Sequence, residues 1–179
     1  MYGETMKKFN FPITKEEIKK LKTGDIVSLS GVIFTARDAA HKYLFEKKPK
    51  EFIKRLSNTA IYHCGPIVKK NGGKYSIIAA GPTTSIREEP YMAKIIKDYK
   101  IKAIIGKGGM GERTVAACKK YNCIYLSAVG GAAALLAKSL KEIRNVYKLE
   151  FGIPEAIWEI KVKDFPAIVT IDCNGKVLK

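Results

Sequence analysis

Acidic side chains are scarce in this sequence of 179 residues, where 17 Asp and Glu stand against 33 Lys and Arg and leave a net charge of +16. Long apolar runs are absent too, since no stretch approaches the about 20 residues that a membrane-spanning helix needs. The first residues also lack the apolar segment of a signal peptide. We therefore expect a soluble, cytoplasmic protein with no span in a membrane.

The four cysteines include no pair at the C-x-x-C spacing. Only Cys118 and Cys123 are close in sequence, and they are expected at a helix end and on the following strand. A metal or iron–sulfur site needs clustered ligands, which this pattern does not provide. We predict free, mostly buried thiols in a reducing cytosol, and no metal site formed by this chain alone.

The excess of positive charge fits three kinds of partner: a nucleic acid, a small anionic substrate or an acidic protein. Composition alone does not choose among them. The lysines are scattered along the chain in pairs such as 7–8, 69–70 and 119–120, and no arginine-rich tail is present. This distribution is typical of solvated helix faces and loops, so nucleic acid is the less favoured partner.

Local patterns predict one α/β domain over residues 1–179, with a mixed sheet and flanking helices. The hydrophobic content of 46 % excludes intrinsic disorder. A capping box formed by Thr14 and Glu17 marks the first helix. Further helices are predicted from Asp38 and over 51–56, 91–99, 112–120 and 132–143, and strands over 25–34, 60–63, 75–79, 103–105, 123–126 and 168–171. The polar segment 69–74 predicts an antiparallel hairpin between strands 60–63 and 75–79.

The segment G-K-G-G-M-G at 106–111 fits the G-x-G-x-x-G pattern of dinucleotide-binding proteins, but the rest of that fingerprint is missing. No carboxylate follows the next strand at 127–131, where one would bind a ribose, and no Gly-Lys-Ser/Thr ends the loop. The segment still has local features that can bind an anion. The N–H groups of Gly106 and Gly108 beside a helix N-terminus, with the charge of Lys107, can hold a carboxylate or a phosphate. A tight turn without a ligand is the open alternative.

A second candidate segment is G-P-T-T-S-I-R at 81–87, which follows a predicted strand. Thr84 or Ser85 is expected to cap the next helix. Arg87 belongs to the same turn, and arginine is suited to bidentate recognition of carboxylates. Hydroxyl groups beside this cation predict a cradle for a polar, anionic ligand.

A third segment, T-A-R-D-A-A-H at 35–41, comes at the end of another strand. Asp38 is either a helix cap or a partner of Arg37. His41 lies three residues after Asp38, close enough on a helix for an orienting hydrogen bond. Alone, this segment fits a structural role as well as a functional one.

Each of these three segments lies at or just after the carboxyl end of a strand, where open α/β sheets bind their ligands. We therefore predict that Arg37, Arg87 and Lys107 converge with hydroxyl groups on a small dianion.

Several motifs together resemble the β subunit, or C-terminal domain, of iron–sulfur class I fumarases and L-tartrate dehydratases. They occur in one order from about residue 10 to the end of the chain, at 35–41, Tyr62 with 65–66, 81–87, 106–110, 129–133 and 151–158. The resemblance implies a swivelling β/β/α domain that closes over a [4Fe–4S] cluster. It also implies that the cluster is held by a partner α subunit and not by this chain.

The resemblance also assigns roles to residues. It implies that Arg37 binds a substrate carboxylate, that Thr83 is the proposed base, and that Arg87 and Lys107 are further substrate contacts. Candidates to take up the proton from Thr83 are His41, Asp38 and Lys107. The remaining predicted binding residues are Thr84, Gly106 and Gly108. Cys64 stands where many relatives carry a small residue, and we interpret it as a buried free thiol rather than a cluster ligand.

The expected function is a β subunit of a fumarate hydratase, interconverting fumarate and (S)-malate and active only with its α subunit. The alternatives within the same class are an L(+)-tartrate dehydratase and a mesaconate hydratase, because the motifs recognise the dicarboxylate that all three substrates share. A basic nucleic-acid-binding protein is the alternative from another class.

Overall fold

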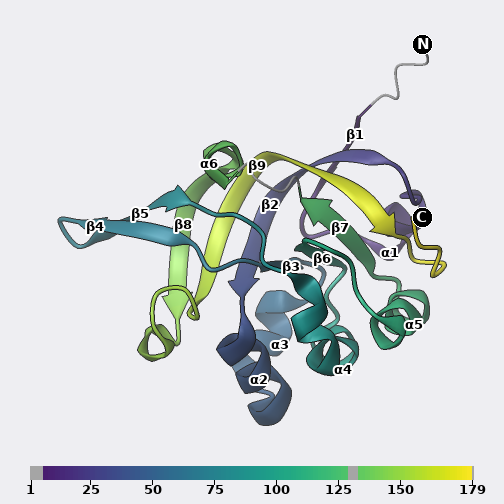
Figure 1. Ribbon diagram of the computed structural model, residues 1–179, viewed down its shortest axis with the longest axis horizontal. Coiled ribbons are helices and arrows are strands. Elements are labelled where there is room, and N and C mark those ends of the chain that lie inside the picture. The colour runs from purple at the N-terminus through teal and green to yellow at the C-terminus, as the bar shows by residue number, and fades with distance from the viewer. Residues whose placement is uncertain (1–5, 129–132, 179) are drawn as a thin grey trace.

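The computed structural model describes residues 6–128 and 133–178 and consists of a strongly curved sheet with a layer of helices on one side (Figure 1). The elements up to the hairpin are β1 (Lys7–Asn10), α1 (Lys15–Lys19), β2 (Ile26–Ala36), α2 (Asp38–Lys47), α3 (Lys50–Leu56), β3 (Ala60–His63), β4 (Ile67–Asn71) and β5 (Lys74–Ala79). They are followed by η1 (Ser85–Glu88), α4 (Glu89–Tyr99), β6 (Ala103–Gly106), α5 (Glu112–Tyr121), β7 (Ile124–Ala128), α6 (Ala133–Ser139), β8 (Leu140–Tyr147), η2 (Leu149–Phe151) and β9 (Ile157–Ile171).

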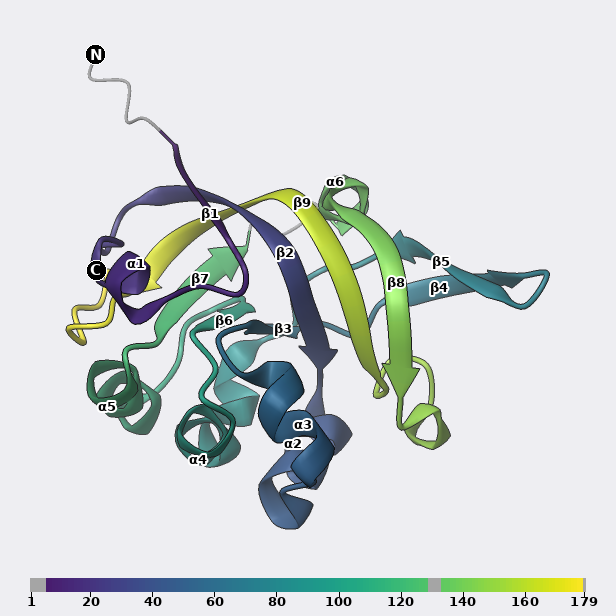
Figure 2. The same ribbon diagram turned by 180° about the vertical axis from the view of Figure 1, so that it is seen from behind.

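The main sheet closes on itself. Its strand order is β1-β2-β3-β6-β7-β9-β8, and β9 also pairs with β2, so that β2, β3, β6, β7 and β9 form a ring. Strands β2, β3, β6 and β7 run parallel, whereas β9 is antiparallel to its neighbours. Seen from behind, β2, β9 and β8 run side by side above α2 and α3 (Figure 2). The predicted mixed sheet with flanking helices is confirmed.

Two apolar cores hold the sheet and the helices together. One fills the inside of the ring, with fully buried aromatic residues such as Tyr62, Trp158 and Phe165. The other lies between the sheet and helices α2–α5 and includes Phe52 and Tyr99. Burying apolar side chains on both faces of the parallel strands explains why those strands are almost continuously hydrophobic.

Gly31 permits a close crossing in the middle of β2. A Cβ atom at this position would lie 2.3 Å from the carbonyl oxygen of Phe11, and the φ angle of Gly31 is +110°. The register between β2 and β9 shifts at the same place, between Leu29 and Gly31. Glycine therefore lets the segment after β1 pass directly over β2 where β2 bends to close the ring.

Most of the elements predicted from the sequence are present. The capping box is confirmed: the backbone N–H of Thr14 donates to Glu17 (2.8 Å), and the N–H of Glu17 donates to the Thr14 hydroxyl (3.2 Å). The four cysteines are free and buried, as predicted. Among the described residues, no helix has the length and apolar character needed to cross a membrane.

Two predicted elements are wrong. The helix expected over 132–143 ends at Ser139, and the chain continues as strand β8, in which Leu140 pairs with Val162 of β9. The start expected at Gly130 and Gly131 lies outside the described residues. The hairpin is formed by β4 and β5 as a separate two-stranded sheet, whereas strand 60–63 pairs in parallel within the main sheet.

Candidate active site

The three cation-bearing segments meet at one edge of the sheet. Arg37 directly follows β2, and Lys107 directly follows β6. Because β3 lies between β2 and β6 and all three strands are parallel, their carboxyl ends share this edge. The segment 81–87 reaches the same edge from the hairpin. The structure thus confirms that these segments come together, although they are far apart in sequence.

Backbone contacts join segment 81–87 to both neighbouring strand ends. Pro82 forms an isolated bridge with Cys64, just after β3, and Thr84 forms one with Lys107, just after β6. The backbone N–H of Thr83 donates to the carbonyl of His63 at 2.8 Å. Thr83 is half-buried and Thr84 is exposed. The turn that carries the two threonines is therefore part of the sheet edge rather than a free loop.

Two of the three predicted cations are paired with carboxylates of this chain. The Nε atom of Arg37 lies 3.4 Å from Glu155, and Arg87 forms an ion pair with Asp38. Lys107 is exposed and makes no ion pair with the described residues. Glu155 also accepts a hydrogen bond from the N–H of Ala39 at 2.9 Å, which holds it at the start of α2. The candidate site therefore contains two ion pairs, Arg37 with Glu155 and Arg87 with Asp38, and one cation, Lys107, without an ion-pair partner among the described residues.

The helix N-terminus expected to bind an external anion already holds a carboxylate. Glu89 accepts hydrogen bonds from the N–H of Gly111 (2.8 Å), the N–H of Thr114 (3.2 Å) and the Thr114 hydroxyl (2.6 Å) at the start of α5. An internal carboxylate therefore already satisfies the donors of Gly111 and Thr114 at this helix end, and the anion site at Gly106, Lys107 and Gly108 stays a prediction. Lys107, at the other end of the loop, keeps its exposed charge.

His41 does not bond to Asp38 as expected. Its Nδ1 atom lies 2.8 Å from the carbonyl oxygen of Arg37 and 3.3 Å from Glu88, and the side chain is fully buried. Burial lowers the pKa of His41 to about 4, so the ring is neutral at pH 7. Asp38 instead lies partly exposed beside Arg87, with 42 % of its side chain accessible.

Ser85 does not act as the predicted helix cap. Its hydroxyl is fully buried and lies 2.8 Å from Nδ1 of His63, 2.9 Å from the hydroxyl of Tyr125 and 3.2 Å from the N–H of Lys107. Thr84, which precedes η1, makes no side-chain cap either. No sequence pattern predicts this cluster, because its members come from β3, η1, β7 and the glycine loop.

Glu88 is a buried carboxyl group directly behind the site. Only 3 % of its side chain is exposed, and its neighbours are His41, Asp38 and Arg87. Burial, together with the neighbouring Asp38 carboxyl, raises the pKa of Glu88 to about 8. The group is therefore mostly protonated at pH 7, when His41 is neutral.

This protonation makes stability depend on pH in a defined direction. Between the ordinary pKa of 4.5 and about 8, folded Glu88 keeps a proton that the unfolded chain releases. The free energy of unfolding should fall as pH rises through this window, by up to about 1.4 kcal/mol per pH unit, and level off above it. Glu88→Gln should flatten this slope in urea denaturation from pH 5 to pH 9. The exposed control Glu46→Gln should not, and equal slopes in all three proteins would contradict the assignment.

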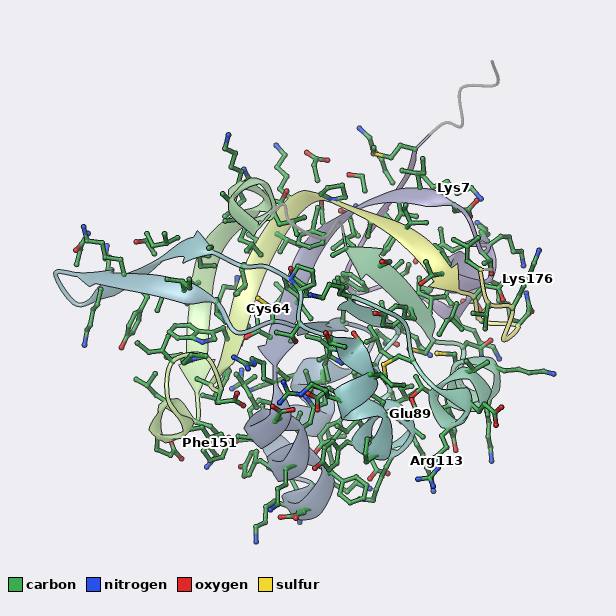
Figure 3. All side chains as sticks on the ribbon, viewed as in Figure 1. Lys7, Cys64, Glu89, Arg113, Phe151 and Lys176 are labelled. Atoms are coloured by element: carbon green, nitrogen blue, oxygen red, sulfur yellow. The ribbon has the colours of Figure 1, made fainter. Side chains whose placement is uncertain are left out.

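None of the cysteines is placed to bind a metal. All four are buried, and burial raises the pKa of the Cys64 thiol to about 12. The interpretation of Cys64 as a buried free thiol is confirmed. Cys64 lies in the middle of the molecule (Figure 3). In the same view, Glu89 marks the start of α4. Within 6–128 and 133–178, no group of three or more His, Cys, Asp or Glu residues is arranged to hold a metal ion.

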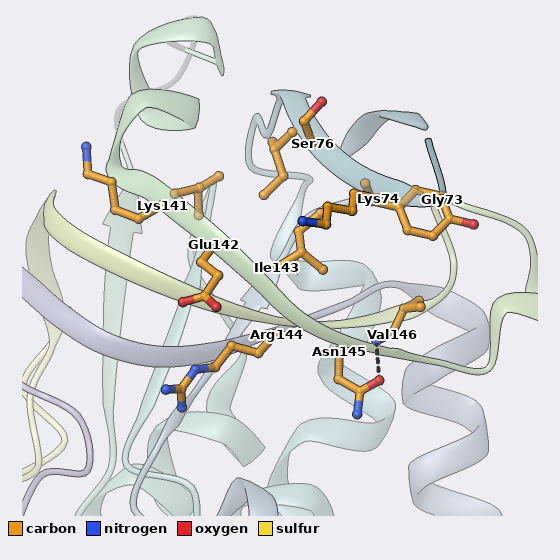
Figure 4. Close-up of a pocket in the computed structure, with 12 residues that line it drawn as sticks. Gly73, Lys74, Ser76, Lys141, Glu142, Ile143, Arg144, Asn145 and Val146 are labelled. Carbon is orange, nitrogen blue, oxygen red and sulfur yellow. Dashed lines mark hydrogen bonds between the residues drawn. The ribbon is translucent and has the colours of Figure 1, made fainter. Parts of the chain in front are cut away.

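A groove of about 670 Å³ lies elsewhere, between the hairpin and β8 (Figure 4). Lys74 and Ile77 of β5 line one side, and Lys141, Ile143 and Arg144 of β8 line the other. None of the predicted site residues lines this groove, so we do not place the active site there.

The model of one protein family, described as the fumarase C-terminus, matches residues 4–178. The chain belongs to the fumarase C-terminus family. Its sequence is 50 % identical over 169 residues to a Geobacillus stearothermophilus protein provisionally named fumarate hydratase class I. That match covers 93 % of this chain and 32 % of the relative, so the chain spans about a third of that protein.

Other relatives are closer to this chain in length. The L(+)-tartrate dehydratase subunit beta of Escherichia coli strain K12 is 40 % identical over 169 residues, which is 93 % of this chain and 83 % of the relative. A Methanocaldococcus jannaschii protein provisionally given the same name is 46 % identical over 167 residues, covering 91 % of this chain and 86 % of the relative. Family membership and the resemblance derived from the motifs therefore agree.

Proposed function

We propose that this chain is the carboxylate-binding subunit of an enzyme that adds water to, or removes it from, a four-carbon dicarboxylate. The leading reaction is the interconversion of fumarate and (S)-malate. The observation that carries this proposal is the meeting of the Arg37, Arg87 and Lys107 segments at one sheet edge, joined by backbone bridges. Two carboxylates of a small dianion match a site whose cations come from separate turns.

The cations would act when charge builds up on the substrate. Removing a proton from the carbon beside a carboxylate moves negative charge onto that carboxylate. Fixed cations stabilise this charge without reorganising, and such stabilisation is a major source of rate enhancement. Arg87 and Lys107 are assigned this role, and Arg37 is assigned binding and orientation of a carboxylate.

Thr83 is the proposed base. A neutral hydroxyl is a weak base unless its own proton can pass to a neighbour. Of the three candidates for that neighbour, His41 is fully buried and already bonded to the Arg37 carbonyl, whereas Asp38 and Lys107 reach the surface. A charged lysine has no lone pair to accept a proton, so Lys107 in its role as a cation cannot take it up. We therefore favour Asp38 over His41 and Lys107 in this role, with Thr84, Gly106 and Gly108 lining the substrate.

The cluster implied by the family resemblance does not fit the described residues of this chain. Their cysteines are buried, and they contain no set of three ligands. The resemblance implies that a [4Fe–4S] cluster would be held by the α subunit over which this domain closes, in a cytoplasmic hetero-oligomer. No step of the mechanism above depends on the cluster.

L(+)-tartrate dehydration is the second candidate reaction. It is favoured by relatives of nearly this length, which carry the name of the tartrate dehydratase subunit beta. Mesaconate hydration stays a third possibility within the class, because the same dicarboxylate contacts would serve it.

Reconstitution tests this proposal. We expect the chain alone to turn over none of the three substrates, and the anaerobically assembled complex with an α subunit to hydrate or dehydrate at least one. Fumarate, L-tartrate and mesaconate are assayed side by side, and the highest kcat/KM identifies the reaction. Turnover by this chain alone, or no turnover of any substrate by a complex containing an intact cluster, would contradict the proposal.

A further inference from the structure

We infer that Ser85 is a positioning residue: with His63 and Tyr125 it forms a buried hydrogen-bond chain that fixes the Lys107 turn against the Arg87 turn. The hydrogen-bond chain is defined by the distances between its atoms and does not depend on the proposed function. Its consequence for turnover rests on the function proposed above.

The hydroxyl of Ser85 connects three parts of the fold. It contacts Nδ1 of His63 on β3 at 2.8 Å, the hydroxyl of Tyr125 on β7 at 2.9 Å, and the N–H of Lys107 at 3.2 Å. The backbone N–H of Ser85 also donates to the carbonyl of Lys107 at 2.9 Å. Ser85 and Lys107 are therefore joined in both directions, and Arg87 lies two residues further along the same short helix.

One direction through this chain of bonds gives every hydroxyl proton an acceptor. The N–H of Gly109 donates to the oxygen of Tyr125 at 3.2 Å, and the Tyr125 hydroxyl donates to Ser85. Ser85 also accepts from the N–H of Lys107, so its own proton is left for Nδ1 of His63. Burial lowers the pKa of His63 well below its usual range, so the ring is neutral and carries its single proton on Nε2.

We assign His41 the opposite tautomer. Its Nδ1 atom lies 2.8 Å from the carbonyl oxygen of Arg37, which can only accept a hydrogen bond, and 3.3 Å from Glu88, and the shorter contact places the proton on Nδ1. The rings of His41 and His63 pack edge to face, with their centres 4.9 Å apart. In both rings Nε2 is buried and has no hydrogen-bond partner among the described residues. The two rings thus extend the chain of polar groups toward the Arg37 backbone.

These side chains cannot touch a substrate themselves. Ser85, His63, His41 and Tyr125 are all fully buried. Each contacts the backbone of a segment that bears a cation, or a side chain that does so. Their effect on a ligand therefore passes through the positions of those segments. A displacement of about 1 Å at a reacting group can cost about a hundredfold in rate.

The tautomers are measurable in the whole chain without any partner, because it contains only two histidines. Nitrogen-15 spectra of the imidazole rings at pH 7 should show one ring protonated on Nε2 and the other on Nδ1. Ser85→Ala and Tyr125→Phe should each shift the Nδ1 signal of His63 and leave His41 in its tautomer. Tyr99→Phe is the matched control, since it removes another buried tyrosine hydroxyl, which bonds to the Leu44 carbonyl. A proton on Nδ1 of His63, or no response of His63 to either variant, would overturn the hydrogen-bond chain.

The same variants test positioning in the complex with the α subunit. We expect Ser85→Ala and Tyr125→Phe to lower kcat by about tenfold or more, while Tyr99→Phe keeps the wild-type kcat even if all three lose thermal stability. Ser85→Cys, which keeps a donor and an acceptor, should recover part of the loss. Wild-type kcat and KM in Ser85→Ala and Tyr125→Phe, with the predicted tautomers present, would overturn the positioning role. An inactive wild-type complex would instead contradict the proposed function and leave the tautomer result standing.

Discussion

Replacing Arg87 with alanine is expected to lower kcat/KM for the dicarboxylate by about 10²- to 10³-fold, the loss typical of removing one donor from a charge-stabilising site. Arg37→Ala and Lys107→Ala should cause losses of the same order. Each variant removes one cation from the shared sheet edge, where charge would build on a substrate carboxylate. Initial rates of the assembled complex measure the effect, and size-exclusion chromatography checks that the α subunit still binds.

Surface lysines away from this edge provide the controls. Lys69 on β4 and Lys119 on α5 are exposed, and their alanine variants change the net charge as much as Lys107→Ala does. They should keep wild-type kcat/KM. Equal losses in these controls would mean that the overall charge of +16 attracts the substrate and that the site is misplaced. The comparison therefore separates local contacts from the field of the whole protein.

Arg87→Lys distinguishes geometry from charge at the same position. Lysine keeps the positive charge but presents a single ammonium group in place of the planar, two-pronged guanidinium. An intermediate kcat/KM is expected if Arg87 binds a carboxylate through two hydrogen bonds. The ion pair of Arg87 with Asp38 gives the arginine a partner when substrate is absent, since both side chains are about half exposed.

The meeting of the three segments that form the candidate site could be predicted from the sequence because it follows from local patterns. Alternating strands and helices predict parallel strands, and parallel strands place the residues after them at a common edge. Arg37 and Lys107 each come directly after such a strand. The capping box at Thr14 was equally predictable, because both of its partners lie within one helical turn.

The errors arose where tertiary contacts override local preference. Residues 133–139 form a helix, and the apolar residues after them continue its pattern as far as Ile143. The structure makes Leu140–Tyr147 a strand because it pairs along β9, with partners ten or more residues away in sequence. Similarly, local composition located a turn at 69–74 but could not identify the strands on either side of it.

The carboxylates and hydroxyls that complete the site were not predictable for a related reason. Glu89 reaches donors that lie 22 to 25 residues further along the chain, and Ser85 bonds to Tyr125, 40 residues away. In sequence, both look like ordinary residues at the start of a helix. Only the packing of η1 against β3, β6 and β7 brings Glu89 to the start of α5 and Ser85 into the buried hydrogen-bond chain.

Gly106 lies so close to the buried side chains around Ser85 that it should tolerate no side chain of its own. A Cβ atom there would lie 1.8 Å from the Ser85 hydroxyl, 3.1 Å from the Tyr125 hydroxyl and 3.2 Å from Nδ1 of His63. Gly106→Ala should therefore lower the free energy of unfolding by about 3 kcal/mol, from overpacking and from buried polar groups that lose their partners. Urea denaturation of the whole chain measures this loss.

Gly108→Ala is the matched control in the same loop. Gly108 has a φ angle of +82°, and the nearest atom to an added Cβ is a methyl carbon of Thr84 at 4.0 Å. Its alanine variant should lose only the about 1 kcal/mol that a left-handed backbone costs a residue with a side chain. A loss in Gly106→Ala no larger than this would mean that η1 can move away from β6. The sheet edge would then be too loosely held to fix Lys107 against Arg87, so this stability measurement also tests how the site is positioned.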